Sequence, residues 1–259
     1  MRLLTFNALI RGDVRARLRA LAEILRESDF DVVCLQEVMY RSHANLLRRG
    51  FAHSACAGSV VLKGGLVLLS RRPIKRWRFV RFPMTGPVRP EFLMRKGALV
   101  AEIDELVIVN THLSANRDDD WSPDNRYALV ERAELDVLAR LLAGIDKDRP
   151  LVVTGDLNLP RDASALADFR TAAGLADAMA GDRRPTYRPT PQWPHPPAFD
   201  HLLVRGGITA HADLVLCDEV TLPGGRRVYL SDHYGVAADI RPRDEFGFSP
   251  WTDGPPRIP

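Results

Sequence analysis

The chain has 259 residues, of which 46% are hydrophobic and 27% are charged, and its formal net charge is +3. This composition is that of a globular protein and excludes a disordered chain. The chain has 36 basic and 33 acidic residues, and so small an excess of positive charge does not indicate nucleic-acid binding. A local basic groove would not show in the net charge.

Apolar runs and their periodicity predict strands that alternate with helices. In chain order we expect strand 2–6, helix 14–27 with Asp13 as its N-cap, strands 31–36, 65–70 and 74–82, a hairpin of strands 99–103 and 106–110, helix 125–143 ended by Gly144, strand 151–154, a helix near 163–172, and strands 202–204, 212–216 and 235–240. This order predicts an α/β protein with mixed sheets and one domain over residues 1–242. The Pro-rich residues 183–198 are expected to form a long loop, and residues 243–259 a Pro- and Gly-rich tail that is partly disordered.

Two of these elements have recognisable faces. In strand 74–82, Trp77 and Phe79 alternate with Arg76 and Arg78, which suits either a nucleic-acid groove or the solvated face of an edge strand, and we favour the edge strand. The apolar face expected for helix 125–143 consists of Leu129, Ala133, Val137, Leu138, Leu141 and Leu142.

The cysteines and the N-terminal residues give an expectation for the cellular location. Cys34, Cys56 and Cys217 are far apart and no CxxC motif occurs, which is typical of a reducing compartment. The chain begins directly with a strand-like segment, and no apolar run reaches the about 20 residues that span a bilayer. We therefore expect a cytoplasmic protein without a transmembrane segment, unless a leader precedes this sequence. No signal sets the oligomeric state.

Polar residues that can bind a metal recur at strand ends, where α/β sheets bind ligands. A single Asp, Asn or His in such a place is more often a turn former, a cap or a structural side chain than a catalyst. The set consists of Asn7, Glu37, His112, Asp156, Asn158, Asp200, Asp232 and His233. Oxygen donors with two histidines and no cysteine suit Mg²⁺, or Mn²⁺ as the alternative, and this chemistry is that of phosphate-ester hydrolysis.

Six motifs in order carry a family resemblance. They are Leu-Gln-Glu-Val (35–38), Leu-Leu-Ser-Arg-Arg-Pro-Ile (68–74), Asn-Thr-His-Leu (110–113), Gly-Asp-Leu-Asn (155–158), Phe-Asp-His-Leu-Leu (199–203) and Ser-Asp-His-Tyr (231–234). Together they resemble the endonuclease/exonuclease/phosphatase superfamily, also called DNase-like, from residue 1 to about 240. The resemblance implies a four-layer α/β sandwich, in which two mixed β-sheets pack face to face with helices on the outside.

The resemblance also implies roles for the polar set. Metal ligation falls to Glu37, Asn7 and Asp232, with Glu37 the principal ligand. The implied catalytic residues are His233, Asp200, which orients its ring, Asp156, Asn158 and His112. The residue that takes the proton of the attacking water, His233 or Asp156, is left open, and so is the number of metal ions.

Two residues differ from the pattern of the AP-endonuclease branch and indicate which branch of the superfamily the chain resembles. The AP-endonuclease branch has Asp where this chain has Leu9, and Tyr where it has His112, so the chain looks more like the sphingomyelinase-type or DNase-type branches. We expect a metal-dependent hydrolase of a small phosphate ester or lipid head group, with a Mg²⁺-dependent DNA or RNA nuclease as the alternative and a non-catalytic binding module disfavoured. The small-substrate preference depends on the aromatic loop residues Tyr187, Trp193 and Phe199, which suit a walled pocket.

Overall fold

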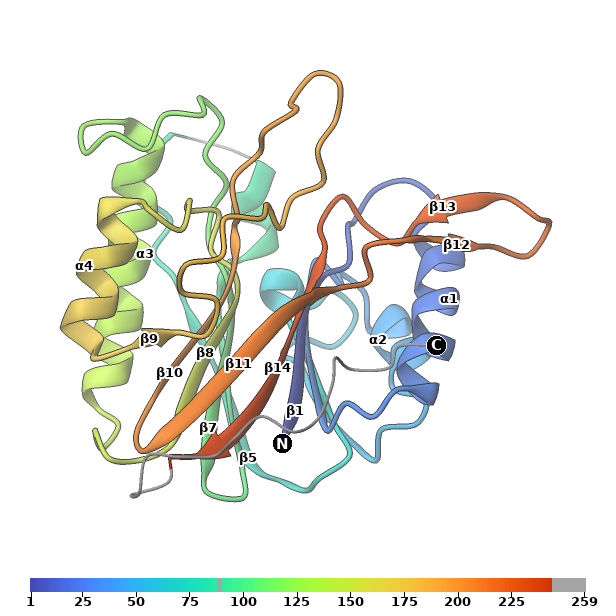
Figure 1. Ribbon diagram of the computed structural model, residues 1–259, viewed down its shortest axis with the longest axis horizontal. Helices are drawn as coiled ribbons and strands as arrows, with labels where there is room; N and C mark the ends of the chain where they lie inside the picture. Colours follow the sequence, from blue (N-terminus) through green and yellow to red (C-terminus); the bar gives the residue numbers. More distant parts are fainter. Residues whose placement is uncertain (88–89, 244–259) are drawn as a thin grey trace.

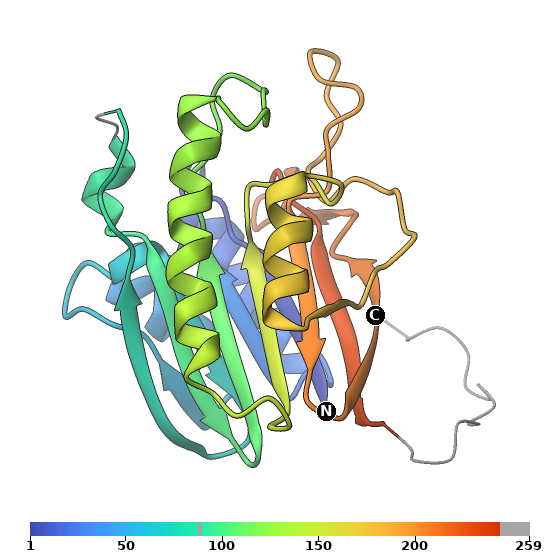
Figure 2. The same ribbon diagram turned by 90° about the vertical axis from the view of Figure 1, so that its left-hand side faces the viewer.

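The computed structural model describes residues 1–87 and 90–243, and these form four layers (Figure 1). Two mixed six-stranded sheets pack face to face in the middle. Helices α1 (Val14–Glu27) and α2 (Arg41–Leu47) cover the outer face of one sheet, and α3 (Arg126–Ala143) and α4 (Ser164–Ala173) cover the outer face of the other (Figure 1). Figure 2 looks onto the face that α3 and α4 cover. The expected α/β sandwich is confirmed.

The first sheet has the spatial order β11, β14, β1, β2, β4, β3, and only the β1–β2 pair is parallel. In that order the strands are Ile208–Val215, Gly235–Pro242, Arg2–Asn7, Val32–Gln36, Val67–Ser70 and His53–Ala55. The second sheet has the order β5, β6, β7, β8, β10, β9, and only the β7–β8 pair is parallel. Its strands are Ile74–Arg81, Gly97–Ile103, Leu106–His112, Leu151–Asp156, Asp200–Arg205 and Ala176–Asp177.

Three short pieces complete the described chain. The 3₁₀ turns η1 (Lys63–Gly65) and η2 (Pro90–Met94) lie in the connections before β4 and β6, and strands β12 (Glu219–Thr221) and β13 (Arg227–Tyr229) form a separate hairpin. None of the helices in the described part of the chain has the length and apolarity needed to cross a membrane.

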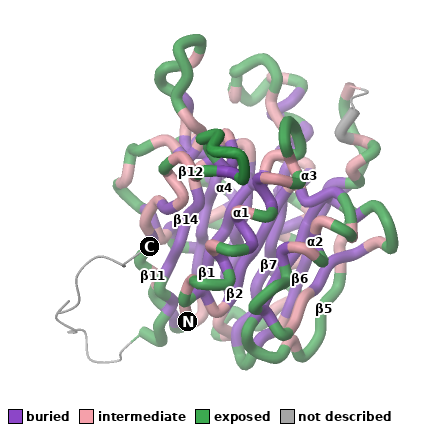
Figure 3. Tube along the Cα trace, turned by 90° about the vertical axis from the view of Figure 1, so that its right-hand side faces the viewer, coloured by how far each residue is buried: buried purple, intermediate pink, exposed green. Residues whose placement is uncertain are grey.

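The core consists of three apolar layers, which Figure 3 shows as buried strands between exposed loops. The middle layer packs one sheet on the other, with Leu3 and Val32 from the first and Ile108 and Leu202 from the second. The outer layers pack α1 and α2, or α3 and α4, onto the sheets. Burial of this apolar surface is the main force that holds the layers together.

Several sequence expectations need correction. Asp13 precedes α1 as predicted, but its side chain makes no capping hydrogen bond and instead pairs with Arg226. The β5 strand lies at a sheet edge as expected and pairs only with β6, and Trp77 is exposed while Phe79, on the same face of the strand, packs against the core layer between the sheets. In α3, Leu129 is exposed because the helix turns Tyr127 and Val130 inward instead.

The short elements α2, β3, β9, β12 and β13 were not predicted, because they are too brief for a periodic pattern to show. Residues 183–198 form the expected irregular loop, interrupted only by a bridge between Tyr187 and His233. The domain boundary after residue 242 stays a prediction, because the expected tail lies almost wholly outside the described residues.

Strand register brings the polar strand ends to one level. Asn7 pairs with Gln36 in the first sheet, and Asp156 lies between His112 and Asp200 in the second. The parallel pairs β1–β2 and β7–β8 end at the level where their antiparallel neighbours β14 and β10 begin. Both sheets therefore place their polar residues at the same end of the sandwich.

Candidate active site

Asp156 is the centre of the site. It ends β8, is only 2% exposed, and receives three groups from different parts of the chain. Its Oδ2 accepts a hydrogen bond from Asn7 Nδ2 at 2.9 Å, and its Oδ1 accepts one from the Asn158 backbone N–H at 2.9 Å. The His112 Nε2 atom lies 3.4 Å from Oδ2. Both sheets therefore meet at this carboxylate.

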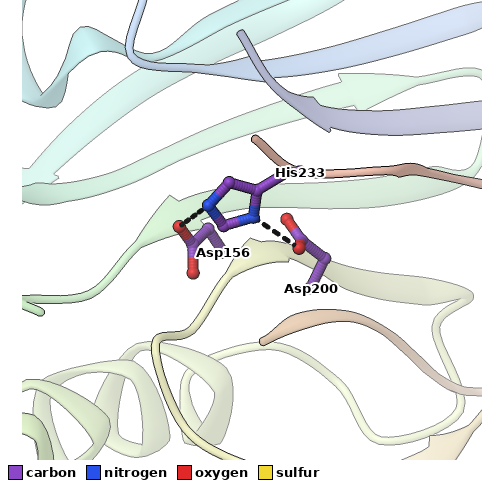
Figure 4. Close-up of side chains that lie close together, drawn as sticks. All are labelled: Asp156, Asp200 and His233. Carbon is purple, nitrogen blue, oxygen red and sulfur yellow. Dashed lines mark hydrogen bonds and ion pairs between the residues drawn. The ribbon is translucent and has the colours of Figure 1, made fainter. Parts of the chain in front are cut away.

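The His233 ring lies between two buried carboxylates (Figure 4). Its Nδ1 is 2.8 Å from Asp200 Oδ2, and its Nε2 is 3.7 Å from Asp156 Oδ2. Burial acts to lower the pKa of His233, but the charges of Asp200 and Asp156 outweigh it and raise that pKa to about 10. His233 is therefore an imidazolium at neutral pH in the metal-free protein.

The pKa of Asp156 moves upward, to about 6, because burial disfavours its charge and the neighbouring Asp200 carboxylate repels it. The imidazolium of His233 and the hydrogen bond from Asn7 act in the opposite direction. At neutral pH Asp156 is thus a carboxylate whose proton affinity is well above that of an ordinary aspartate, which is the property of a general base.

His112 differs from His233 in charge. Burial first, and the positive charges of Lys96 and His233 second, lower its pKa well below the usual value, so this imidazole is neutral. Its Nδ1 atom is buried without a hydrogen-bond partner in the described structure. Lys96 is itself buried and donates from Nζ to the Leu113 carbonyl at 2.7 Å. A neutral imidazole beside a fixed cation suits recognition of an anionic oxygen.

Two of the predicted residues, Glu37 and Asn158, have a strained backbone conformation that sets the direction of their side chains. Glu37 and Asn158 have φ values of 61° and 51°, a region that costs a side-chain-bearing residue roughly 1–3 kcal/mol. Each comes directly after a strand or a short turn, so the left-handed residue turns the chain sharply at the end of the sheet. Gly65 fits against the Glu37 backbone, where a Cβ on this glycine would lie 3.1 Å from Glu37 Cα.

Glu37 and Asp232 lie to one side of the Asp156 cluster. Glu37 is half-buried, and its Oε2 accepts the Ile10 backbone N–H at 2.7 Å, while its Oε1 has no hydrogen-bond partner within the described ranges. Asp232 Oδ2 accepts from the Tyr187 hydroxyl at 3.2 Å. Burial, and then the nearby carboxylates of Asp232 and Glu37, raise the pKa of Tyr187 to about 12. Both acids therefore face the region around this hydroxyl.

Buried polar links hold the two sheets in register beneath the site. Gln36 Nε2 donates to Asn110 Oδ1 at 2.8 Å and to Thr5 Oγ1 at 3.0 Å. Asn110 Nδ2 donates across to the carbonyls of Leu35 and Val67. These links fix the distance between the strands that carry Glu37 and His112.

Arg17 was not identified from the sequence. This buried side chain of α1 donates to the carbonyls of Ala8, Leu9 and Arg11, just after Asn7, and to that of Leu230, just before the 231–234 motif. It thus joins two loops of the site. The signal available in the sequence was an arginine on the apolar face of helix 14–27, one position before Leu18.

A row of aromatic rings runs from His233 to Asn158. The Tyr187 ring lies edge-on to His233 with centroids 5.0 Å apart, and the rings of Trp193, Phe199 and Trp121 follow at centroid distances of 5.4, 6.0 and 5.7 Å. Trp121 Nε1 donates to the Asn158 carbonyl at 3.0 Å. One side of the site is therefore apolar and aromatic.

The donor set fits a hard divalent cation at Glu37, whose Oε1 is unsatisfied and partly accessible. Asp156, Asp200 and His233 also offer atoms within 4.8 Å of one another. In that trio, however, His233 Nδ1 and Asp200 Oδ2 already bond each other, and Asp156 Oδ2 is bonded to Asn7. We therefore regard the trio as a proton-handling group and the Glu37 side as the place for a cation.

The predicted residues thus fall into two groups. The structure brings Asn7, His112, Asn158, Asp200 and His233 together around Asp156. It places Glu37 and Asp232 beside this cluster, near Tyr187.

Comparisons with known proteins bear on the family and the fold. The model of the "Endonuclease/Exonuclease/phosphatase family" matches residues 4–233. A "Putative neutral sphingomyelinase" of Drosophila melanogaster is 25% identical over 90% of this chain, and the match spans only 58% of that relative's length.

Two solved structures share the fold. The beta toxin of Staphylococcus aureus with bound magnesium ions superposes with a TM-score of 0.69 at 15% identity, over 92% of this chain and 98% of that one. D. rerio TDP2, complexed with a single-strand DNA product, superposes with a TM-score of 0.70 at 19% identity, over 93% of this chain and 98% of that one.

Proposed function

We propose that this chain, which belongs to the endonuclease/exonuclease/phosphatase family, is a metal-dependent hydrolase of phosphate esters. The observation that carries the proposal is the buried Asp200–His233 pair, with Nδ1 and Oδ2 2.8 Å apart, facing the Asp156 carboxylate. The Asp156 carboxylate, whose pKa is raised, lies beside the Glu37 and Asp232 carboxylates to which we assign a cation. Such an arrangement moves a proton and neutralises phosphoryl charge at the same place.

The residues supply the groups for an in-line displacement, in which the water oxygen bonds to phosphorus as the opposite P–O bond to the leaving oxygen breaks. Asp156 accepts a proton from the attacking water, because its pKa of about 6 leaves it ionised yet basic at neutral pH. His233, kept positively charged by Asp200, stabilises the phosphoryl oxygens as their charge grows. Neutral His112 donates a hydrogen bond to the same anion. Asn158 and Asn7 hold Asp156 in place.

A bound divalent cation supplies additional neutralisation of the phosphoryl oxygens. We assign it to Glu37 and Asp232 and propose Mg²⁺, with Mn²⁺ as the alternative, because the donors are oxygens. The Asn7 side chain is engaged at both ends, donating to Asp156 and accepting from the Leu9 N–H at 3.1 Å. We therefore revise its role from metal ligand to positioning residue.

The substrate we propose is a compact phosphodiester or phosphomonoester, such as a lipid head group. The aromatic row beside His233 gives the site an apolar wall, which suits an enclosed small substrate. The similarity to a protein named as a sphingomyelinase supports the same class. The unpaired cysteines support our expectation of a reducing, cytoplasmic location.

A nuclease is the second candidate. The fold similarity to TDP2, whose structure contains a single-strand DNA product, favours it, and partly buried aromatic rings such as that of Trp193 stack on bases as readily as they enclose a head group.

One panel of assays tests the proposal and separates the candidates. Purified protein with Mg²⁺ is given bis(p-nitrophenyl) phosphate, sphingomyelin in mixed micelles, supercoiled plasmid and single-stranded RNA, with His233→Ala as the control. We expect hydrolysis of the first two that is lost in the control. Inactivity on all four substrates with Mg²⁺ and with Mn²⁺ would remove the proposal, and efficient plasmid nicking would replace it with the nuclease.

A further inference from the structure

Positive charge is concentrated in one part of the chain. Residues 38–90 contain eleven lysines and arginines and no aspartate or glutamate, so the rest of the chain is net acidic. This segment forms α2, β3, β4 and β5. The edge strands β3 and β5 of the two sheets contact each other, so the basic segment covers one flank of the sandwich. The small net charge of +3 is therefore the sum of one strongly basic segment and an acidic remainder.

Ion pairs neutralise part of this flank. Just after α2, Arg49 pairs with Glu23 at 3.7 Å. At the start of β5 the paired cations are Arg72 with Asp104 at 2.9 Å, Lys75 with Glu105 at 2.8 Å, and Arg76 with Glu102 at 2.7 Å. Farther along β5, the exposed Arg78 and Arg81 have no carboxylate partner among the described residues. Arg81 pairs in register with Gly97, which pairs with His112. The uncompensated charge thus lies at the catalytic end.

Exposed apolar side chains accompany these free cations. Val60 and Val61 are neighbours in a turn, with 70% of Val60 accessible, and Val61 forms a bridge with the exposed Tyr40. The Arg81 guanidinium lies 3.0 Å from the sulfur of Met84, which is exposed as well. Between the two sets, Lys63 Nζ lies 6.0 Å from the centroid of the Phe79 ring in β5. Lys63, two residues after Val61, therefore lies beside the strand that carries Arg78 and Arg81.

We propose that this surface docks on an anionic lipid bilayer. We call it the basic rim and define it by Tyr40, Val60, Val61, Arg78, Arg81 and Met84. Exposed aliphatic side chains enter the head-group region of a membrane, and unpaired arginines are attracted by anionic lipids. A nucleic acid is the competing occupant, because the exposed ring of Trp77 precedes Arg78 in β5 and can stack on a base. We favour the bilayer because Val60, Val61 and Met84, three of the four apolar members of the rim, are not aromatic and suit insertion among lipid head groups.

The basic rim adjoins the catalytic end. Tyr40 comes three residues after Glu37, and the 3₁₀ turn that follows Val61 contains Gly65, which packs on the Glu37 backbone. Docking here brings lipid head groups to the edge of the candidate site. The inference rests on the proposed function for its purpose, but binding to a membrane is measured without catalysis.

The test is sedimentation with sucrose-loaded vesicles of phosphatidylcholine, with and without 30% phosphatidylserine, in EDTA so that no hydrolysis occurs. We expect the protein to sediment with the anionic vesicles and to be released by salt. Arg78→Gln/Arg81→Gln should lower the partition coefficient at least about tenfold, since each cation near such a surface contributes roughly a factor of five. Val60→Ser/Val61→Ser should lower it similarly, by removing the inserted side chains.

Arg72→Gln/Arg76→Gln is the matched control. It removes the same charge from the same flank, but at positions that are already ion-paired, and should leave vesicle binding within about twofold. All three variants should hydrolyse soluble bis(p-nitrophenyl) phosphate at the wild-type rate.

The outcomes separate this inference from the proposed function. Absence of vesicle binding by the wild type, or an equal loss in the control, overturns the docking surface. Binding of a single-stranded oligonucleotide that depends on Arg78 and Arg81, without vesicle binding, assigns the rim to nucleic acid instead. Vesicle binding by a protein that hydrolyses no phosphate ester retains the docking surface and removes the enzymatic proposal.

Discussion

Replacing Asp200 with asparagine tests whether Asp200 acts only through His233. The two side chains are buried and joined by a 2.8 Å contact, and the backbone N–H of Asp200 is fixed by Thr186 Oγ1 at 2.9 Å. Asparagine keeps the shape of the side chain and removes its charge. The substitution therefore changes the electrostatics of the imidazole while the backbone stays in place.

The size of the effect follows from the charge. The carboxylate of Asp200 is the principal group that outweighs burial and raises the pKa of His233 to about 10. Without it, only the charges of Asp156 and Asp232 oppose burial, so the pKa of His233 falls and the cationic donor to the phosphoryl group is weakened. Loss of one preorganised donor of this kind costs roughly 2.7–4 kcal/mol, which is about 10²- to 10³-fold in turnover. His233→Ala also removes the ring and should cost at least about 10³-fold.

The assay is a double-mutant cycle on kcat/KM for bis(p-nitrophenyl) phosphate at saturating Mg²⁺. Since Asp200 has no role without the ring, the double variant should lie within about tenfold of His233→Ala alone. Multiplication of the two single losses would refute the reasoning and show that Asp200 acts on its own. Circular dichroism and thermal melts of each variant control for misfolding.

The same pair makes a prediction about stability. Because the folded-state pKa of His233 is raised above the unfolded value of about 6.5, its contribution to stability is complete below that pH and is lost as the pH rises through about 10. The difference in free energy of unfolding between the metal-free wild type and His233→Ala should therefore shrink across this window, and a difference that grows with pH would contradict the raised pKa.

Three further predictions concern metal, base and backbone. Glu37→Gln should raise the Mg²⁺ concentration for half-maximal activity at least about tenfold in a metal titration, whereas Asp118→Asn, an exposed loop acid, should leave it unchanged. If Asp156 is the general base, kcat/KM should fall with decreasing pH through an apparent pKa no higher than about 6, and an acid limb well above this value would assign the base elsewhere. Gly155→Ala should destabilise the protein by more than about 3 kcal/mol in urea titration, because the Cβ would lie 1.9 Å from the Thr111 carbonyl at a φ of 137°, and near-wild-type stability would show that the strands separate easily.

The sequence predicted the features that have strong local signals. Helix 14–27 agrees with the structure at both ends, because its apolar residues recur at helical spacing up to Leu25. The polar residues at strand ends were found for a similar reason, since each lies next to a short apolar run: Asn7, Glu37, His112, Asp156 and Asn158 after one, and Asp200, Asp232 and His233 before one. The order of the motifs then implied the fold, and the match over residues 4–233 agrees with it.

Features that depend on tertiary contacts were not predictable in this way. The position of Arg17 on the apolar face of its helix sets it apart from the solvated arginines, but its role appears only in the fold, where the loops at Ala8 and Leu230 meet its guanidinium. The engagement of Asn7 with Asp156 spans both sheets. Trp77 and Phe79 share the alternation of a packed strand, but only Phe79 reaches the core layer between the sheets, and the sequence does not show how far along an edge strand that layer extends.

The central claim is that this protein hydrolyses phosphate esters with the aid of a divalent cation. The most direct measurement is the rate of bis(p-nitrophenyl) phosphate hydrolysis by protein stripped with chelator, verified metal-free by mass spectrometry, and titrated with Mg²⁺ or Mn²⁺. We predict no activity in the stripped protein and a saturable return in the wild type that is absent in His233→Ala. Full activity in the verified metal-free protein would contradict the account.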